Sequence, residues 1–435
     1  MLSSLRQRLQ QEGFLKHVAT LMTGTTVAQA IMLLAAPVLT RLYSPEQFGL
    51  FGLYTTAVGF LAIVVTGKYD LAILLPAEDR DAARLVWLSL GITFSLCLLM
   101  ALGLIVLQQP LQQLIGGNHS NWLWLLPLAT AAQGIYLTLN AWNNRLKRYR
   151  QIAINRAAQS LSIVGSQLGL GWLMADKGSQ GLILGSFFGY LLAALWWSVT
   201  TWRSDSALLR RPGLAGIRAQ AHQHADLPRY AIATDLLSYV FFQMPIAVLT
   251  SFFGVQAVGY YSLTQRVLGV PMVFIASSVG DVFRQRASAD YAQRGECLDI
   301  FRSTFRNLSL LVIAPAILLA IIAPDLFAWI FGEPWRDAGY YARILLPMFV
   351  CKFVTNPLSY VFLITGRQKL DLILHLLMLG VLAAGMSWVL HAWRTEYGVL
   401  AVFSAAYSVM YVVYLILSWR FAHGRASAPL CEARS

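Results

Sequence analysis

Apolar stretches of about 20 residues recur along the whole chain, separated by short polar segments. A helical stretch of this length spans the hydrocarbon core of a bilayer, because a helix rises ~1.5 Å per residue. Twelve spans can be drawn, at 16–40, 47–67, 84–107, 120–142, 152–174, 179–201, 229–252, 256–282, 303–323, 339–363, 370–391 and 397–419. The pattern predicts an all-α membrane protein with twelve transmembrane helices.

Composition supports this class of protein. Hydrophobic residues make up 57% of the 435 residues and charged residues 12%, whereas a soluble domain has roughly 25% charged residues. The four cysteines show no paired spacing and no ligand cluster, so we expect neither a disulfide nor a metal site.

Lysine and arginine are concentrated on one side of the predicted membrane, called here the basic side. Of the 33 Lys and Arg residues, 26 fall in segments on this side, five fall on the other side, and Arg266 and Lys352 lie inside spans. The positive-inside rule places the basic side, with both termini, in the cytoplasm. The net charge of +13 therefore reports membrane topology and not a nucleic-acid partner.

The chain also contains a weak internal repeat. Residues 38–54 align without gaps on residues 248–264. Each half holds six spans, an even number, so the repeat is parallel about an axis along the membrane normal. We expect an N-terminal six-helix lobe at 1–202, a basic cytoplasmic linker at 203–228 and a C-terminal six-helix lobe at 229–435.

Charged residues inside the spans are the first candidates for function. Arg266 lies about ten residues into its span, near mid-membrane, where an arginine costs roughly 2.5–3.5 kcal/mol and normally faces a bundle interior or a wet cavity. Asp235, in the neighbouring antiparallel span, lies at a similar depth. The two residues form either a structural ion pair or a substrate-binding cation with its counter-ion, and the sequence leaves both open.

Lys352 is a second cation in the interior of a span of the same lobe. Asn356 lies four residues further on, so both side chains share one helix face. A lobe whose buried charges are mainly positive predicts an anionic substrate. Diphosphate is a compact, doubly charged group that arginine binds well.

Four further residues are candidate site residues, and each also has a simpler interpretation. Lys68 and Asp70 lie at the cytoplasmic end of the second span, where an interfacial charge pair is the simpler interpretation. Arg41 is either an interface anchor or a ligand, and His375 either a protonation site or a hydrogen-bonded packing residue. The sequence has no HExxH motif, no Walker A motif and no large loop, so we do not expect an enzyme.

Four segments occur in the order LTRLYSPEQFGLFGLY, GKYDLAILLP, NNRLKRYRQIAINR and GYYSLTQRVLGVPMVFIASSVGDVFRQRAS. In this order they resemble the bacterial oligosaccharide-lipid flippases, the polysaccharide-biosynthesis branch of the multidrug, oligosaccharidyl-lipid and polysaccharide exporter superfamily. The resemblance implies two six-helix lobes around a central cavity that opens alternately to each side. It also implies an undecaprenyl-diphosphate-linked oligosaccharide as substrate, and Arg266 matches the family's arginine that is expected to receive the diphosphate.

The resemblance further implies flipping across the bacterial inner membrane for O-antigen, capsule or exopolysaccharide assembly. Besides membrane lipids, the implied partners are a polysaccharide polymerase and a chain-length regulator. No cofactor is expected, and coupling to H⁺, Na⁺ or the membrane potential stays open. The alternatives are a multidrug exporter of the same superfamily, a polysaccharide polymerase or ligase, and a scaffold; exporters commonly carry an acid in the first spans, and residues 16–40 contain none.

Overall fold

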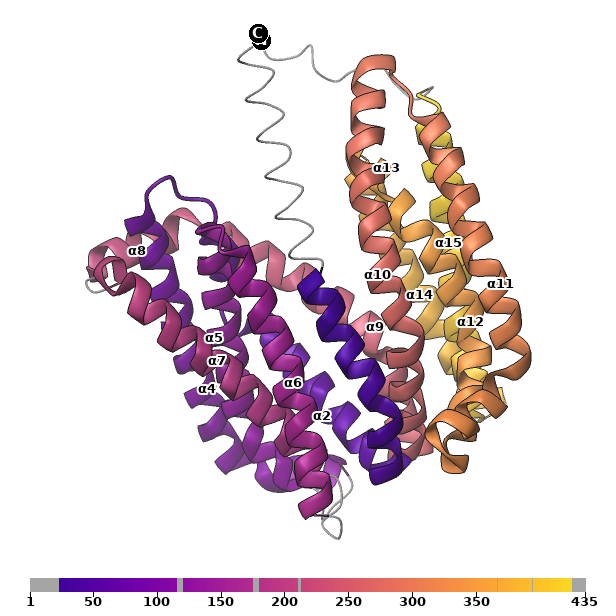
Figure 1. Ribbon diagram of the computed structural model, residues 1–435, viewed down its shortest axis with the longest axis horizontal. Helices are drawn as coiled ribbons and strands as arrows, with labels where there is room; N and C mark the ends of the chain where they lie inside the picture. Colours follow the sequence, from indigo (N-terminus) through magenta and orange to yellow (C-terminus); the bar gives the residue numbers. More distant parts are fainter. Residues whose placement is uncertain are drawn as a thin grey trace. The chain divides into compact units, whose positions relative to one another are not determined.

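The computed structural model describes residues 23–115, 120–174, 180–209, 213–365, 367–392 and 394–424. These residues are almost entirely helical. The chain divides into two compact units, Met1–Ala247 (the first unit) and Val248–Ser435 (the second unit) (Figure 1).

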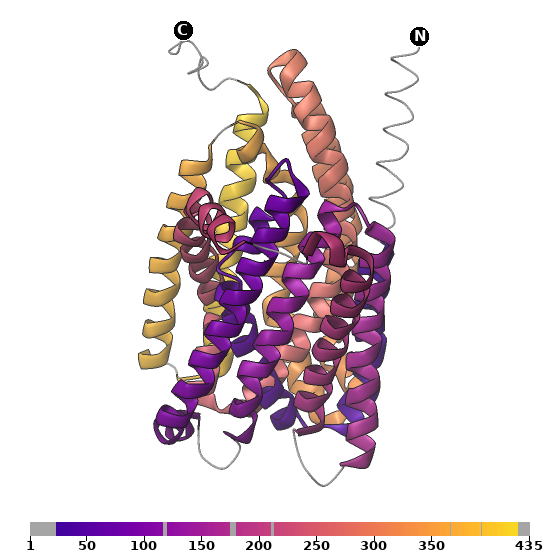
Figure 2. The same cartoon turned by 90° about the vertical axis from the view of Figure 1, so that its left-hand side faces the viewer.

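Helices make up each unit. The first unit contains the helix Thr23–Leu42, α2 (Pro45–Val64), α3 (Tyr69–Ala72), α4 (Asp79–Ile115), η1 (Ser120–Leu125), α5 (Leu126–Arg145), α6 (Tyr149–Leu173), α7 (Gln180–Leu209), α8 (Leu214–Gln223), η2 (Leu227–Ala231) and most of α9 (Ile232–Phe253). The second unit contains α10 (Val255–Arg294), α11 (Leu298–Phe331), η3 (Glu333–Trp335), α12 (Arg336–Leu358), α13 (Tyr360–Ile364), α14 (Gln368–Ala392) and α15 (Glu396–Ala422). Within each unit the long helices run side by side with their axes roughly aligned (Figures 1 and 2).

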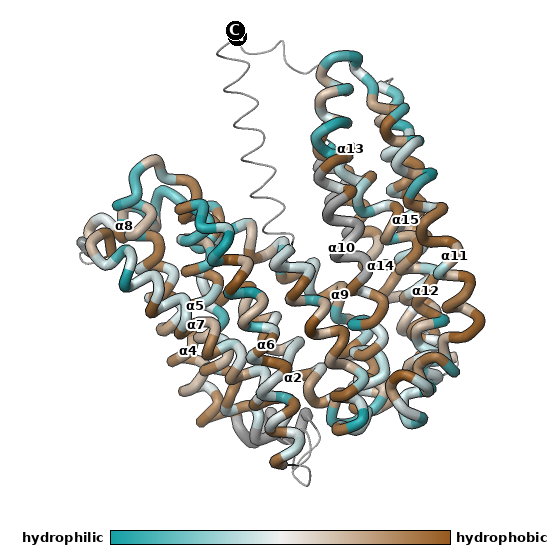
Figure 3. Tube along the Cα trace, in the orientation of Figure 1, coloured by the Kyte–Doolittle hydropathy of each residue, from teal (hydrophilic) through white to brown (hydrophobic). Residues whose placement is uncertain are grey.

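The predicted all-α membrane fold is confirmed. In the described part of the chain, nine helices are long and apolar enough to cross a membrane. Hydrophobic residues lie along the middle of the helices, and hydrophilic residues gather toward their ends (Figure 3). Each of the twelve predicted spans overlaps a helix where the chain is described. Because α6, α10 and α14 are not among the nine, the count of twelve stays a prediction.

Local sequence explains where α2 begins and ends. The Ser44 side chain accepts a hydrogen bond from the backbone N–H of Gln47, and the Gln47 side chain accepts one from the backbone N–H of Ser44. This capping box, with Pro45 in the first turn, fixes the start of the helix. After Val64 the chain reaches Gly67 and Lys68, both with positive φ, and this conformation ends the helical run.

Glycines allow α6 and α7 to pack closely. A Cβ on Gly185 would lie 2.6 Å from Cγ of Gln167, and one on Gly189 would collide with Cγ1 of Ile163. Small residues at such contacts let helix backbones approach, which is a common way of holding helices together in membranes. The pairing of these two helices therefore depends on two glycines of α7.

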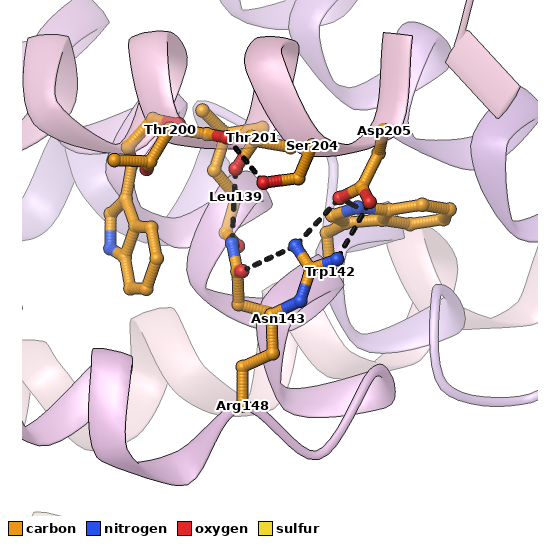
Figure 4. A network of polar contacts seen from close by, with 9 residues as sticks. Leu139, Trp142, Asn143, Arg148, Thr200, Thr201, Ser204 and Asp205 are labelled. Carbon is orange, nitrogen blue, oxygen red and sulfur yellow. Dashed lines mark hydrogen bonds and ion pairs between the residues drawn. The ribbon is translucent and has the colours of Figure 1, made fainter. Parts of the chain in front are cut away.

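A polar network joins α5 and the turn after it to α7 at the basic side of the first unit (Figure 4). Arg148 donates two hydrogen bonds to the Asp205 carboxylate, at 2.7 and 2.6 Å, and Trp142 donates a third at 2.9 Å. Asn143 donates to the hydroxyl of Thr201 at 3.1 Å. Asp205 is only 6% exposed and has a non-helical backbone conformation within α7. The basic segment NNRLKRYRQIAINR thus supplies structural contacts to the bundle.

The boundary between the two units falls inside α9, two residues after Pro245. The first part of α9 belongs to the first unit, although the second predicted lobe begins at residue 229. Residues 203–228 include the end of α7 and the whole of α8. The division of the chain into lobes at 203–228 stays a prediction.

Candidate functional site

Arg266 lies on a polar, half-exposed face of α10. Ser262, Arg266 and Gly269 follow one another at helical spacing, and all three are partly exposed. No described atom lies within 4 Å of the point where a Cβ on Gly269 would stand. On the opposite face, the Thr264 hydroxyl donates a hydrogen bond of 2.8 Å to the carbonyl of Ala338 in α12. Arg266 therefore projects away from the contact between α10 and α12.

Lys352 lies on a face of α12 that changes from buried to exposed along the helix. Leu345 and Met348 on this face are buried, whereas Lys352 is half-buried and Asn356 is exposed. The Lys352 ammonium lies 6.0 Å from the centroid of the Phe349 ring, at the outer limit of a cation–π contact. Lys352 and Asn356 thus share one open face, and their role as site residues stays a prediction.

The two cations of the second unit lie at different depths. α10 and α12 run in the same direction, because Thr264 contacts the start of α12 and Gly280 lies beside Pro357 near its end. At ~1.5 Å per residue, Lys352 therefore lies about 15 Å further along the helix pair than Arg266. Since both helices start on the side poor in Lys and Arg, Lys352 is the cation closer to the basic side.

Asp235 forms an ion pair with Lys68 in the first unit, with 2.6 Å between Nζ and Oδ2. The Lys68 side chain is 15% exposed and the Asp235 side chain 49%. Asp70 is buried and accepts a hydrogen bond of 2.6 Å from the hydroxyl of Thr66. Lys68 is thus paired with Asp235 and not with Asp70. The predicted pairing of Asp235 with Arg266 stays a prediction.

Two polar side chains that follow Asp235 on the same face of α9 contact α2. The Tyr239 hydroxyl donates to the backbone carbonyl of Thr56 at 3.0 Å, and Gln243 donates to the Thr56 hydroxyl at 3.0 Å. Gly59 leaves room for the Tyr239 hydroxyl, because a Cβ at this position would collide with it. This contact was not predicted, although the spacing of Asp235, Tyr239 and Gln243 at i, i+4 and i+8 already marks one helix face.

The structure says less about the two remaining candidate residues, Arg41 and His375. Arg41 is exposed at the end of the helix Thr23–Leu42. The side chain of His375, in α14, lies outside the described residues. Among the described residues, no group of three or more His, Cys, Asp or Glu side chains is placed to hold a metal ion.

Residues 38–339 match the model of a family described as polysaccharide biosynthesis protein, which covers more than half of the chain. The chain belongs to the polysaccharide biosynthesis protein family. It is similar to the succinoglycan biosynthesis transport protein ExoT of Rhizobium meliloti (strain 1021), with 24% identity over 331 residues. The aligned part is 72% of this chain and 59% of ExoT, so the chain spans less than two thirds of that relative.

Solved structures of transporters share the fold. The lipid II flippase MurJ in an inward closed conformation superposes with a TM-score of 0.71 at 11% identity, over 91% of this chain and 86% of that chain. An inward-facing multidrug resistance transporter of the MATE family superposes with a TM-score of 0.65 at 15% identity, over 92% and 94%. These structures and ExoT are named as transport proteins and not as enzymes. The predicted polysaccharide biosynthesis family is confirmed.

Proposed function

We propose that this protein flips an undecaprenyl-diphosphate-linked oligosaccharide from the cytoplasmic to the periplasmic leaflet by alternating access. The observation that carries the proposal is the pair of cations in the second unit. Arg266 and Lys352 lie on partly exposed faces of α10 and α12, about 15 Å apart in depth. The membership in a polysaccharide biosynthesis family supports the same conclusion.

Staggered cations suit a diphosphate that crosses the membrane. An arginine binds phosphate oxygens through a bidentate fork, and a lysine binds them as a point charge, so Arg266 and Lys352 provide two stations of unlike chemistry. Of these two cations, Lys352 lies closer to the basic side and meets the group before Arg266, which holds it deeper in the membrane. With the cytoplasm negative, each negative charge that moves outward gains about 2.3 kcal/mol per 100 mV, so the potential favours export.

Flipping of the lipid-linked oligosaccharide by purified protein in proteoliposomes tests the proposal. Charge-assisted hydrogen bonds contribute about 1.5–3 kcal/mol, so Arg266→Ala should reduce the flipping rate roughly 10- to 100-fold. Arg266→Lys should retain part of the rate because it keeps the charge. Arg302→Ala, which removes an exposed arginine at the basic end of α11, is the matched control and should flip normally. Normal flipping by Arg266→Ala would refute the role of Arg266.

The MATE-like fold favours a second candidate function, export of organic cations. The two functions make opposite predictions for charge. A diphosphate needs Arg266, whereas a cationic drug is repelled by it, so Arg266→Ala should raise drug export if this second function is correct. Native mass spectrometry of the purified protein separates the two by the molecule it carries.

In this proposal the protein resides in the bacterial inner membrane with both termini in the cytoplasm. A polysaccharide polymerase and a chain-length regulator would then act on the exported units. Protease accessibility of a terminal tag in right-side-out and inverted vesicles measures the orientation. Protection of both termini in right-side-out vesicles is the expected result.

A further inference from the structure

Lys68 is held in a backbone conformation that non-glycine residues rarely adopt. Its φ is 60° and its ψ is 10°, directly after Gly67 at φ 59°. The Thr66 hydroxyl accepts a hydrogen bond of 3.3 Å from the Lys68 backbone N–H and donates one of 2.6 Å to the Asp70 carboxylate. Strained residues that their surroundings hold in place occur preferentially at binding sites and switches. The turn therefore fixes the Lys68 ammonium against Asp235.

The counter-ion of Lys68 is accessible to solvent on the basic side. The Asp235 side chain is 49% exposed, while that of Lys68 is 15% exposed. Just before α9, the π-helical turn η2 packs against α3, which follows Lys68 directly. This turn carries Arg229, an exposed residue with no ion pair or side-chain hydrogen bond within the described residues. Arg229 is thus a second cation, on a turn that packs directly against the segment after Lys68, and it is exposed to an anion from the solvent.

α9, the helix that carries Asp235, contains a proline at which it can bend. Proline at position 245 removes a backbone hydrogen bond from the helix interior, and such residues are the usual cause of helix kinks. Upstream of it, the polar side-chain contacts that join α9 to α2 and to the turn after it include the ion pair of Asp235 and the neutral hydrogen bonds of Tyr239 and Gln243 with Thr56. The ion pair is the one charged contact among these three.

We propose that Lys68 and Arg229 bind the diphosphate of the ligand on the basic side, and that its oxygens displace Asp235 from Lys68. The displacement releases the first part of α9 from α2. A diphosphate carries more charge and more acceptor oxygens than one carboxylate, and the lysine ammonium has three donors to satisfy. The inference rests on the proposed function in taking a lipid-linked diphosphate as the natural ligand.

Binding of inorganic pyrophosphate to the full-length protein in nanodiscs tests the first step. Asp235→Asn removes the competitor and should tighten binding about two- to fivefold, in line with the strength of a partly exposed ion pair. Lys68→Ala should weaken binding at least about tenfold. Lys147→Ala is the matched control, because Lys147 also has positive φ, at 55°, and it should bind normally.

Asp235→Asn and Lys68→Ala change the binding affinity in opposite directions only if Asp235 competes with the ligand. A purely structural ion pair would make Asp235→Asn as harmful as Lys68→Ala, or leave binding unchanged in both. Either of these results would overturn the proposal.

Cross-linking tests the second step. With the four native cysteines replaced by serine, Thr56→Cys and Gln243→Cys should be joined by a short bifunctional methanethiosulfonate reagent, because the two native side chains are in hydrogen-bond contact. Pyrophosphate, or a polyprenyl diphosphate supplied in the nanodisc, should slow this cross-linking severalfold. A response to the lipid alone identifies the lipid as the source of the diphosphate. No response to either compound would overturn the proposal.

The outcome is separable from that of the flipping assay. A protein that flips the lipid-linked oligosaccharide but shows neither response refutes the displacement of Asp235 alone. A protein that responds to pyrophosphate but does not flip the lipid refutes the proposed function and leaves the diphosphate site in place.

Discussion

Removal of the Asp205 carboxylate should destabilise the first unit strongly. Asp205 is 6% exposed and accepts two hydrogen bonds from Arg148 and one from Trp142. Loss of one partner of a buried ion pair costs about 3–5 kcal/mol, because the other charge is left uncompensated. The Arg148 side chain is 25% exposed and regains some hydration, so we expect about 3 kcal/mol for Asp205→Ala.

The expected loss is large enough to measure by thermal unfolding in detergent. For domains of about 150–250 residues, 1 kcal/mol shifts Tm by about 2–4 °C, so Asp205→Ala should lower Tm by about 6–12 °C. Asp205→Asn keeps an acceptor for the Trp142 indole and should fall between the wild type and the alanine variant. Asp81→Ala, which breaks a more exposed i, i+3 pair with Arg84, should shift Tm by no more than about 2 °C.

A double-mutant cycle completes the test. If the cost comes from a stranded charge, Arg148→Ala in the Asp205→Ala background should cost less than it does in the wild type. A Tm for Asp205→Ala within about 2 °C of the wild type would refute the reasoning. So would strict additivity of the two substitutions, because the network of Figure 4 would then not act as one unit.

Two further predictions concern packing and burial. Gly189→Ala places a Cβ within 2.9 Å of the Ile163 backbone and should lower the free energy of unfolding by about 1–3 kcal/mol. Gly165→Ala, with no described atom within 4 Å of its Cβ, is the control and should leave the stability unchanged or raise it. Equal shifts of Tm in the two variants would contradict the close packing of α6 and α7. Burial raises the pKa of the Cys297 thiol to about 11, so maleimide should label it slowly at pH 7.5 and faster as pH rises toward 11. Labelling at pH 7.5 as fast as that of an exposed Ser303→Cys variant would contradict this.

The sequence predicts the helices well because their signal is local. Apolar length and flanking charge identify each span without knowledge of its neighbours. The prediction is less exact at helix ends. From residue 180 on, the predicted span 179–201 lies within α7. The helix runs on to Leu209, because Asp205 allows a change of backbone conformation there and anchors the extension to Arg148.

This local signal does not identify ion-pair partners that lie far apart in the sequence. Lys68 and Asp235 are separated by more than 160 residues, and their pairing depends on which helix packs against α2. Judged by depth along the membrane normal alone, Arg266 was as good a candidate partner for Asp235 as Lys68. One usable signal was present: Tyr239 and Gln243 continue the face of Asp235 along a largely apolar helix. Polar side chains on one face of a transmembrane helix indicate a contact with another polar face.

Burial of the counter-ion distinguishes two of the ion pairs of the first unit, Lys68–Asp235 and Arg148–Asp205. Lys68–Asp235 and Arg148–Asp205 have the same closest distance, 2.6 Å. The carboxylate of Asp205 is buried and also bonded to Trp142, so an anion from the solvent meets no exposed edge from which to displace it. The carboxylate of Asp235 is half-exposed, so it is already partly hydrated and its replacement by phosphate costs less desolvation. Proximity of opposite charges therefore does not distinguish the two pairs, and the half-exposed partner of Lys68 makes Lys68, not Arg148, the candidate for anion binding.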